Sequence, residues 1–282
     1  MPRAAAIAVS HGGGPMPVLG DPSHKDIVSS LRNRVPKILK LGTPDAPRAI
    51  VVVTAHWSEN RPTISSGKKH PLLYDYGGFP AAAYRLKYDA PGSPEVAEQV
   101  RQAFTEAGLS PVMDDERGWD HGVFVPFLLI NPAADIPVVQ LSVLQSEDAE
   151  AHLRMGRALG ALRDSNVAIV GSGFASFHNM AAMRHLMMSG SPGAVRARNE
   201  AWNAALTAAV GETDAAEREA RLSKWRELPY SYDMHPRYGA EHFLPLLVVA
   251  GAALEGDGKA KAYKDEFLGV DIWTYYWGDV EV

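Results

Sequence analysis

Continuous apolar runs alternate along the chain with segments of helical periodicity. Four such runs predict buried strands, because a strand covered on both faces is apolar at every position. A fifth, aromatic stretch predicts closing strands at the end of the chain. The four runs and the aromatic stretch span residues 4–9, 48–55, 136–143, 167–171 and 263–277.

Segments with apolar residues at helical spacing lie between these strands. The predicted helices span residues 24–41, 94–107, 149–162, 194–226 and 243–254. Pro36 predicts a kink or early end in the first of them, and the fourth is expected to break near Gly211. The alternation predicts an α/β fold: a single domain with a central, mostly parallel or mixed sheet flanked by helices.

Composition narrows the function classes. The formal net charge of the 282 residues is −5 and no basic tract is present, so nothing favours nucleic acid or an anionic membrane as a partner. No apolar run reaches transmembrane length, and Met1-Pro2-Arg3 lacks a signal-peptide pattern, so we expect a cytoplasmic protein. Because cysteine is absent, any metal site must use nitrogen and oxygen ligands.

Histidines in loops are the strongest chemical signal. His11 follows the first strand and precedes Gly12-Gly13-Gly14-Pro15, and His56 follows the second. Three further loop histidines are His121, His178 and His235. Sheet topology brings the carboxyl ends of strands together, so we predict that His11 and His56 are metal ligands. Neutral imidazole suits zinc, iron, copper and nickel.

Other readings of these residues are weaker. The spacing does not match the helical H-E-x-x-H pattern, and Gly171-Ser172-Gly173 lacks the third glycine of a dinucleotide turn. No G-x-S-x-G nucleophile motif occurs. Four histidines are interpreted as scattered, hydrogen-bonded surface residues: His24, His70, His152 and His185. Trp57, Trp119 and Phe177 are interpreted as core or loop packing, with an aromatic substrate pocket as the alternative because they lie near candidate histidines.

Short motifs in one order along nearly the whole chain carry a resemblance to a known family. They are Ser10-His11-Gly12-Gly13-Gly14-Pro15, Thr54-Ala55-His56-Trp57, Tyr76-Gly77-Gly78-Phe79-Pro80, Trp119-Asp120-His121-Gly122, His178-Asn179, His235-Pro236-Arg237 and Glu241-His242-Phe243-Leu244-Pro245-Leu246. With these motifs the chain resembles the class III extradiol ring-cleavage dioxygenases, especially the DOPA-dioxygenase branch.

The resemblance implies one catalytic domain over residues 1–282 that cleaves a catechol-type ring with O₂ at a non-haem Fe(II) ion. It implies His11, His56 and His235 as metal ligands and His178 as the acid/base residue. His121 would contact substrate or oxygen. Zinc occupies such sites in related proteins, so a zinc-loaded crystal would be compatible with Fe(II) in action.

Several alternatives stay open at the sequence level. The wider class often uses two histidines and a carboxylate, so Glu241 and His242 compete with His235 for the third ligand position. A zinc-dependent hydrolase on the same fold, or a non-catalytic protein that binds a partner in its histidine cleft, would use the same residues. The sequence leaves the catechol's substituents, the position of ring cleavage, the native metal and a homo-oligomeric state undecided.

Overall fold

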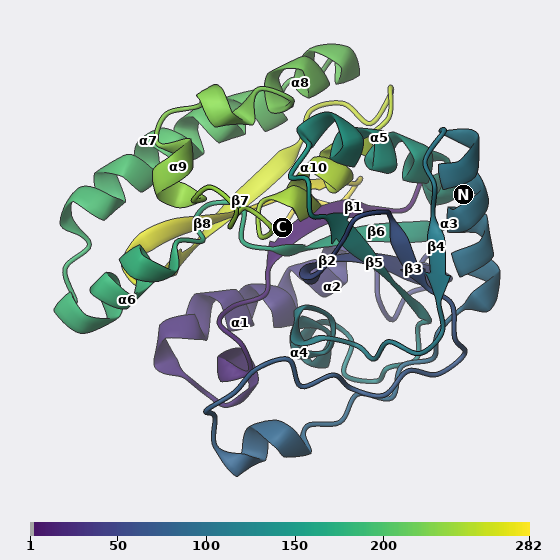
Figure 1. Cartoon of the computed structure of the whole chain (residues 1–282), viewed down its shortest axis with the longest axis horizontal. Coiled ribbons are helices and arrows are strands. Elements are labelled where there is room, and N and C mark those ends of the chain that lie inside the picture. The colour runs from purple at the N-terminus through teal and green to yellow at the C-terminus, as the bar shows by residue number, and fades with distance from the viewer. Residues whose placement is uncertain (1–2) are drawn as a thin grey trace.

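A computed structural model describes residues 3–282. Met1 and Pro2 lie outside the described residues, although the predicted domain and the N-terminal segment considered above include them. The strands form one eight-stranded mixed sheet with helices on both faces (Figure 1), as the pattern of the sequence predicts. The strand order is β4-β3-β5-β2-β6-β1-β8-β7. The strands are β1 (Ala6–Ser10), β2 (Ala49–Glu59), β3 (Thr63–Ser65), β4 (Val112–Asp114), β5 (Val138–Leu144), β6 (Val167–Gly173), β7 (Lys261–Phe267) and β8 (Val270–Trp277).

Ten α-helices occur among residues 3–282. They are α1 (Lys25–Asn33), α2 (Val35–Ile38), α3 (Pro94–Glu106), α4 (His121–Ile130), α5 (Ala149–Gly160), α6 (Met180–Ser189), α7 (Gly193–Val210), α8 (Ala215–Leu222), α9 (Ser231–Met234) and α10 (Leu244–Gly251). The break between α1 and α2 falls at Arg34, two residues before Pro36, and the break between α7 and α8 includes Gly211, both as predicted. Helix α6 and the three-residue strands β3 and β4 were not predicted, because short or exposed elements leave little periodicity.

The centre of the sheet explains why distant residues meet. Strands β1, β6, β2 and β5 are parallel to one another, so their carboxyl ends lie along one edge of the sheet. Ser10 at the end of β1 pairs with Gly173 at the end of β6. The His11 amide then donates to the Gly173 carbonyl at 3.2 Å. The glycine turn after β1 therefore starts beside the loop that follows β6.

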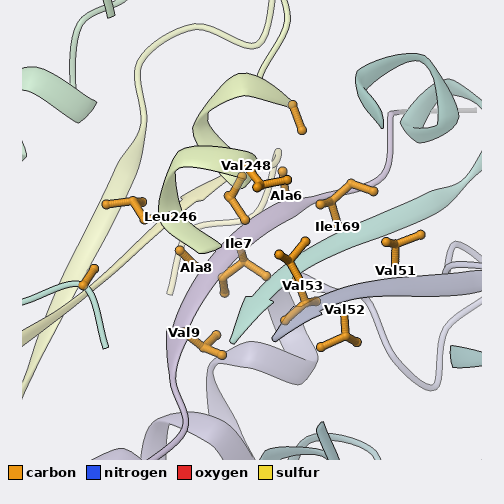
Figure 2. Packing of buried hydrophobic residues seen from close by; sticks show 14 of the residues in the cluster. Ala6, Ile7, Ala8, Val9, Val51, Val52, Val53, Ile169, Leu246 and Val248 are labelled. Carbon is orange, nitrogen blue, oxygen red and sulfur yellow. The ribbon is translucent and has the colours of Figure 1, made fainter. Parts of the chain in front are cut away.

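Small residues let α10 approach the sheet closely. Ala8 of β1 pairs with Gly171 of β6, where a Cβ would lie only 2.7 Å from the Pro245 carbonyl oxygen at the start of α10. Figure 2 shows α10 above β1, with Val248 close to Ala6. Helix α4 packs against β2 and β6, with α1 beside it, on the opposite face of the sheet (Figure 1). Both faces are thus covered, which explains the uninterrupted apolar strands.

Strand β2 differs from its prediction in a way that shapes the site. We expected the strand to end before His56, but it continues to Glu59. Its pairing with β5 shifts between Thr54 and Ser58, so residues 55–57 form a bulge. A bulge redirects side chains locally. The Thr54 hydroxyl accepts the His56 amide at 3.1 Å, which fixes the backbone that carries this histidine.

His152 is a buried structural group, contrary to its interpretation as a surface residue. Its side chain on α5 is 0% exposed. Its Nε2 accepts the Leu144 amide at 2.9 Å, and its Nδ1 lies 2.6 Å from the Asp148 carbonyl oxygen. Both ring nitrogens of the neutral form are therefore used, and burial lowers the pKa of His152 to about 4.

This burial makes stability depend on pH. Below pH 6.5 His152 is protonated in the unfolded chain but stays neutral in the native state. The free energy of unfolding therefore decreases as the pH falls from 6.5 toward 4. We expect wild type to lose about 2 kcal/mol more than His152→Gln between pH 7 and pH 5. Urea unfolding at the two pH values measures this difference. An equal loss in both proteins would contradict the assignment.

Within the described part of the chain, no helix combines the length and apolar character needed to cross a membrane.

Candidate metal centre

Three histidines from distant segments meet at the carboxyl edge of the sheet. His11 follows β1, His56 lies in the β2 bulge, and His242 precedes α10; one ring nitrogen of each lies within 4.8 Å of the others. Nε2 of His56 and Nε2 of His242 are 3.3 Å apart. Two nitrogens bound to one tetrahedral ion at about 2.1 Å from it would be about 3.4 Å apart. The separation therefore fits a shared cation.

The partners of these rings fix which nitrogen is free. Nδ1 of His11 lies 2.7 Å from the Gly12 carbonyl oxygen, and Nδ1 of His242 lies 2.9 Å from a Glu241 carboxylate oxygen. Nδ1 of His56 faces an Asp75 carboxylate oxygen at 3.7 Å. In His11 and His242 the Nδ1 atom thus has an oxygen within hydrogen-bond distance that can accept its hydrogen, which leaves a lone pair on Nε2; the 3.7 Å contact of His56 is too long for a hydrogen bond. Outer partners of this kind orient histidines that bind metals.

The electrostatics of the cluster favour neutral rings. Burial, reinforced by the neighbouring imidazoles, lowers the pKa of His11, His56 and His242 well below the usual value. Nε2 of His11 is buried and has no hydrogen-bond partner among residues 3–282. A buried polar atom without a partner is costly, and a cation would satisfy it. The three residues therefore fit a metal ion held by neutral imidazoles.

His121, the first residue of α4, lies directly beside this cluster. Its ring centroid is 3.7 Å from that of His56 and 5.6 Å from that of His11. Its Nδ1 is 2.8 Å from a carboxylate oxygen of Asp75. The structure thus places His121 next to two of the three converging histidines.

His178 lies on the other side of the cluster. Its ring stacks on His242 with centroids 3.4 Å apart and planes inclined by 15°. Its Nδ1 lies 3.8 Å from a Glu241 carboxylate oxygen. Burial lowers the pKa of His178 to about 4, so the ring is neutral at pH 7 and able to accept a proton.

His235 does not join the histidines that the sequence analysis grouped it with. It belongs to none of the clusters of potential ligands found in the described chain. Its side chain is fully buried between Trp202, Trp225 and Phe243, and its Nε2 donates to the Ala175 carbonyl at 2.9 Å. Among the described residues it is therefore His242, one of the alternatives considered for the third position, that lies with His11 and His56.

The aromatic residues named with the histidines pack in the core, the first of their two interpretations. Trp57, Trp119 and Phe177 are almost completely buried and belong to the interior. The aromatic side chains near the cluster are Phe174, whose ring centroid lies 5.9 Å from that of His11, and residues of the loop at 67–93. Tyr76 lies 5.7 Å from the His121 ring and 5.4 Å from the Phe79 ring. A Cβ on Gly14, in the turn after His11, would contact Phe79 at 3.2 Å, so this loop packs against the glycine turn.

Asp75 was not predicted from the sequence, and His242 was given only as an alternative. Asp75 lies in a loop without periodicity, and only its long-range partners reveal it. His242 was recognised as a candidate but ranked below His235. The signal that could have favoured it is its position: it lies two residues before α10, the helix that packs on the ends of β1 and β6.

Comparisons with known proteins identify the family to which the chain is similar. Residues 5–274 match the family described as the catalytic LigB subunit of aromatic ring-opening dioxygenase. Dioxygenase tasH of Hapsidospora irregularis is 55% identical over 289 residues, covering 100% of this chain and 88% of that protein. The 4,5-DOPA dioxygenase extradiol of Beta vulgaris is 35% identical over 249 residues, covering 88% of this chain and 86% of that protein.

A solved structure extends the comparison to three dimensions. The crystal structure of an uncharacterized protein from Escherichia coli K12 superposes with a TM-score of 0.70 at 29% sequence identity. The superposition covers 98% of this chain and 100% of that one.

Proposed function

Because the chain belongs to the family of the catalytic LigB subunit of aromatic ring-opening dioxygenase, we propose that it cleaves a catechol-type ring beside its hydroxyl groups, using O₂ and a non-haem Fe(II) ion. The family makes the chain an extradiol ring-opening dioxygenase; the catechol, O₂ and Fe(II) are the proposal. The observation that carries it is the convergence of three neutral imidazoles whose free nitrogens approach one point. Residues 1–282 would act as one catalytic domain.

His11, His56 and His242 would hold the metal. Three nitrogen ligands from three separate loops leave coordination positions open, which an open catalytic site requires. When bound, Fe(II) would hold both reactants close together and favour ionisation of the catechol hydroxyl groups. The residues around the ion would then accept and donate the protons of the catechol hydroxyl groups.

His178 would serve as the acid/base residue. A base must remove the second catechol proton, and the neutral ring of His178 can accept it. The stack on His242 holds this ring against a proposed ligand, which limits its motion relative to bound substrate. His121 would contact substrate or oxygen from the opposite side, beside His56.

Tyr76 and Phe79 would line the approach to the metal. They lie between His121 and the glycine turn after His11, where a flat ring could pack against them. Several relatives are named for 4,5-DOPA, so a catechol with an amino-acid side chain belongs among the substrates to test.

The test is anaerobic loading of the purified protein with Fe(II), followed by catechol, protocatechuate or DOPA and then O₂. We expect consumption of O₂ and a yellow ring-opened product with at least one of these catechols. Protein loaded with Zn(II) is the control, because zinc does not change oxidation state and should support neither signal.

Ring opening in the zinc-loaded control would contradict Fe(II) as the working metal. Stoichiometric Fe(II) without O₂ uptake on any catechol would contradict the proposed reaction. Hydrolysis of amide or ester substrates by the zinc-loaded protein would favour a hydrolase on the same fold.

A further inference from the structure

Asp75 is a carboxylate that the loop at 67–93 brings into the histidine cluster. Its side chain is 19% exposed, although the loop around it lies at the surface. One oxygen accepts both the His121 amide at 3.0 Å and His121 Nδ1 at 2.8 Å. The other oxygen lies 3.7 Å from Nδ1 of His56. The Asp75 carboxylate therefore faces Nδ1 of His121 and Nδ1 of His56.

Backbone pairing holds Asp75 in this place. The Leu73 amide donates to the Trp119 carbonyl at 2.7 Å, and the Trp119 amide donates to the Pro71 carbonyl at 2.8 Å. These bonds align the segment before Asp75 with the segment before His121. Two residues beyond the pairing, the two side chains meet. The Tyr76 hydroxyl donates to the Ala83 carbonyl at 2.7 Å, which closes the loop on the other side of Asp75.

Asp75 also accepts a helix amide that the side chain of Asp120, the residue next to His121, does not accept. Asp120 is the residue before α4, but its side chain makes no capping bond to this helix within the described chain. Its carboxylate instead accepts the Thr54 hydroxyl at 2.8 Å and pairs with Arg117 at 3.2 Å. Asp75 accepts the amide of His121, the first residue of α4. The orientation of His121 thus depends on a loop some 46 positions away in the sequence.

When the His121 ring carries a single hydrogen, these contacts decide which nitrogen holds it. A carboxylate only accepts, so the hydrogen must be on Nδ1, facing Asp75. Nε2 then carries a lone pair on the side away from Asp75. A carboxylate that holds an imidazole in one tautomer can control catalysis without itself reacting, as the aspartate does in serine proteases.

We propose that Asp75 is a positioning residue that locks His121 in the Nδ1–H tautomer, so that Nε2 of His121 is presented to substrate as a hydrogen-bond acceptor. The inference that this nitrogen meets substrate rests on the proposed function. The tautomer itself does not. Asp75 is thereby coupled to two partners, because the same carboxylate faces Nδ1 of His56.

The first test observes the tautomer directly in metal-free protein. Long-range ¹H–¹⁵N spectra of ¹⁵N-histidine-labelled protein at neutral pH distinguish Nδ1–H from Nε2–H, and His121→Gln assigns the signal. We expect wild-type His121 to be in the Nδ1–H form. Asp75→Asn should shift it toward Nε2–H or a mixture, because an amide can also donate to Nδ1. Asp89→Asn, an exposed position in the same loop, should leave it unchanged.

The second test measures the consequence in the Fe(II)-loaded enzyme. Asp75→Asn should lower kcat about 10- to 100-fold, the usual range for loss of an outer partner, with a much smaller change in KM. The backbone amide spectrum of each variant reports whether it is folded. An Nε2–H tautomer in wild type, or an unchanged tautomer in folded Asp75→Asn, would overturn the proposal. The expected tautomer in a protein without ring-opening activity would instead overturn only the proposed function.

Discussion

Replacing His242 with alanine is expected to reduce bound metal to less than about a tenth of the wild-type content and to lower turnover at least about 100-fold. Loss of an outer partner alone costs about 10- to 100-fold in metal affinity or activity, and loss of a ligand should cost more. The expectation follows from the 3.3 Å approach of its Nε2 to Nε2 of His56. Metal analysis after dialysis against Fe(II) or Zn(II) measures the first effect, and O₂ uptake with a catechol measures the second.

The matched control is His235→Gln, because the two histidines compete for the same role. A glutamine amide can still donate to the Ala175 carbonyl that His235 bonds, so the fold should tolerate the change. We expect this variant to keep stoichiometric metal. Metal loss in His235→Gln together with full metal in His242→Ala would restore His235 as the ligand. Thermal unfolding of both variants shows whether any loss comes from an unfolded chain.

Replacing His178 with glutamine is expected to leave metal content unchanged while turnover falls about 100- to 10,000-fold, the range for removal of a general base. The ring is neutral at pH 7, because burial lowers its pKa to about 4, so it carries a free lone pair before the reaction. Its Nδ1 lies 3.8 Å from a carboxylate oxygen of Glu241, which can balance the charge that appears on the ring. Single-turnover ring opening under O₂ measures the chemical step apart from product release.

A second variant separates proton transfer from packing. His178→Phe keeps an aromatic ring where His178 stacks on His242, but it has no proton acceptor. We expect full metal content and turnover as low as in the glutamine variant. Wild-type turnover in His178→Phe would mean that the ring serves only to support His242.

The central strands and the helices that cover both faces of the sheet could be predicted from the amino-acid sequence. Apolar runs without alternation specified the central strands, because helices cover both faces of the sheet. Two of the three converging histidines, His11 and His56, were predicted from their places after strands, since parallel strands bring their carboxyl ends to one edge. His121 and His178 were expected near them, and the structure does place both rings against the cluster. Their catalytic roles stay predictions.

Only the three-dimensional structure shows that His242, and not His235, lies beside His11 and His56. Both lie in the same irregular segment, and no local pattern tells which side chain turns toward the sheet. The choice comes from backbone contacts: the Phe174 amide donates to the His242 carbonyl at 2.8 Å, and Gly173 lacks the Cβ that would collide with that carbonyl. His235 is held instead by the Ala175 carbonyl. The position of Asp75 could not be predicted either. It depends on the long-range pairing of residues 71–73 with Trp119, and the sequence between these segments has no pattern that indicates this pairing.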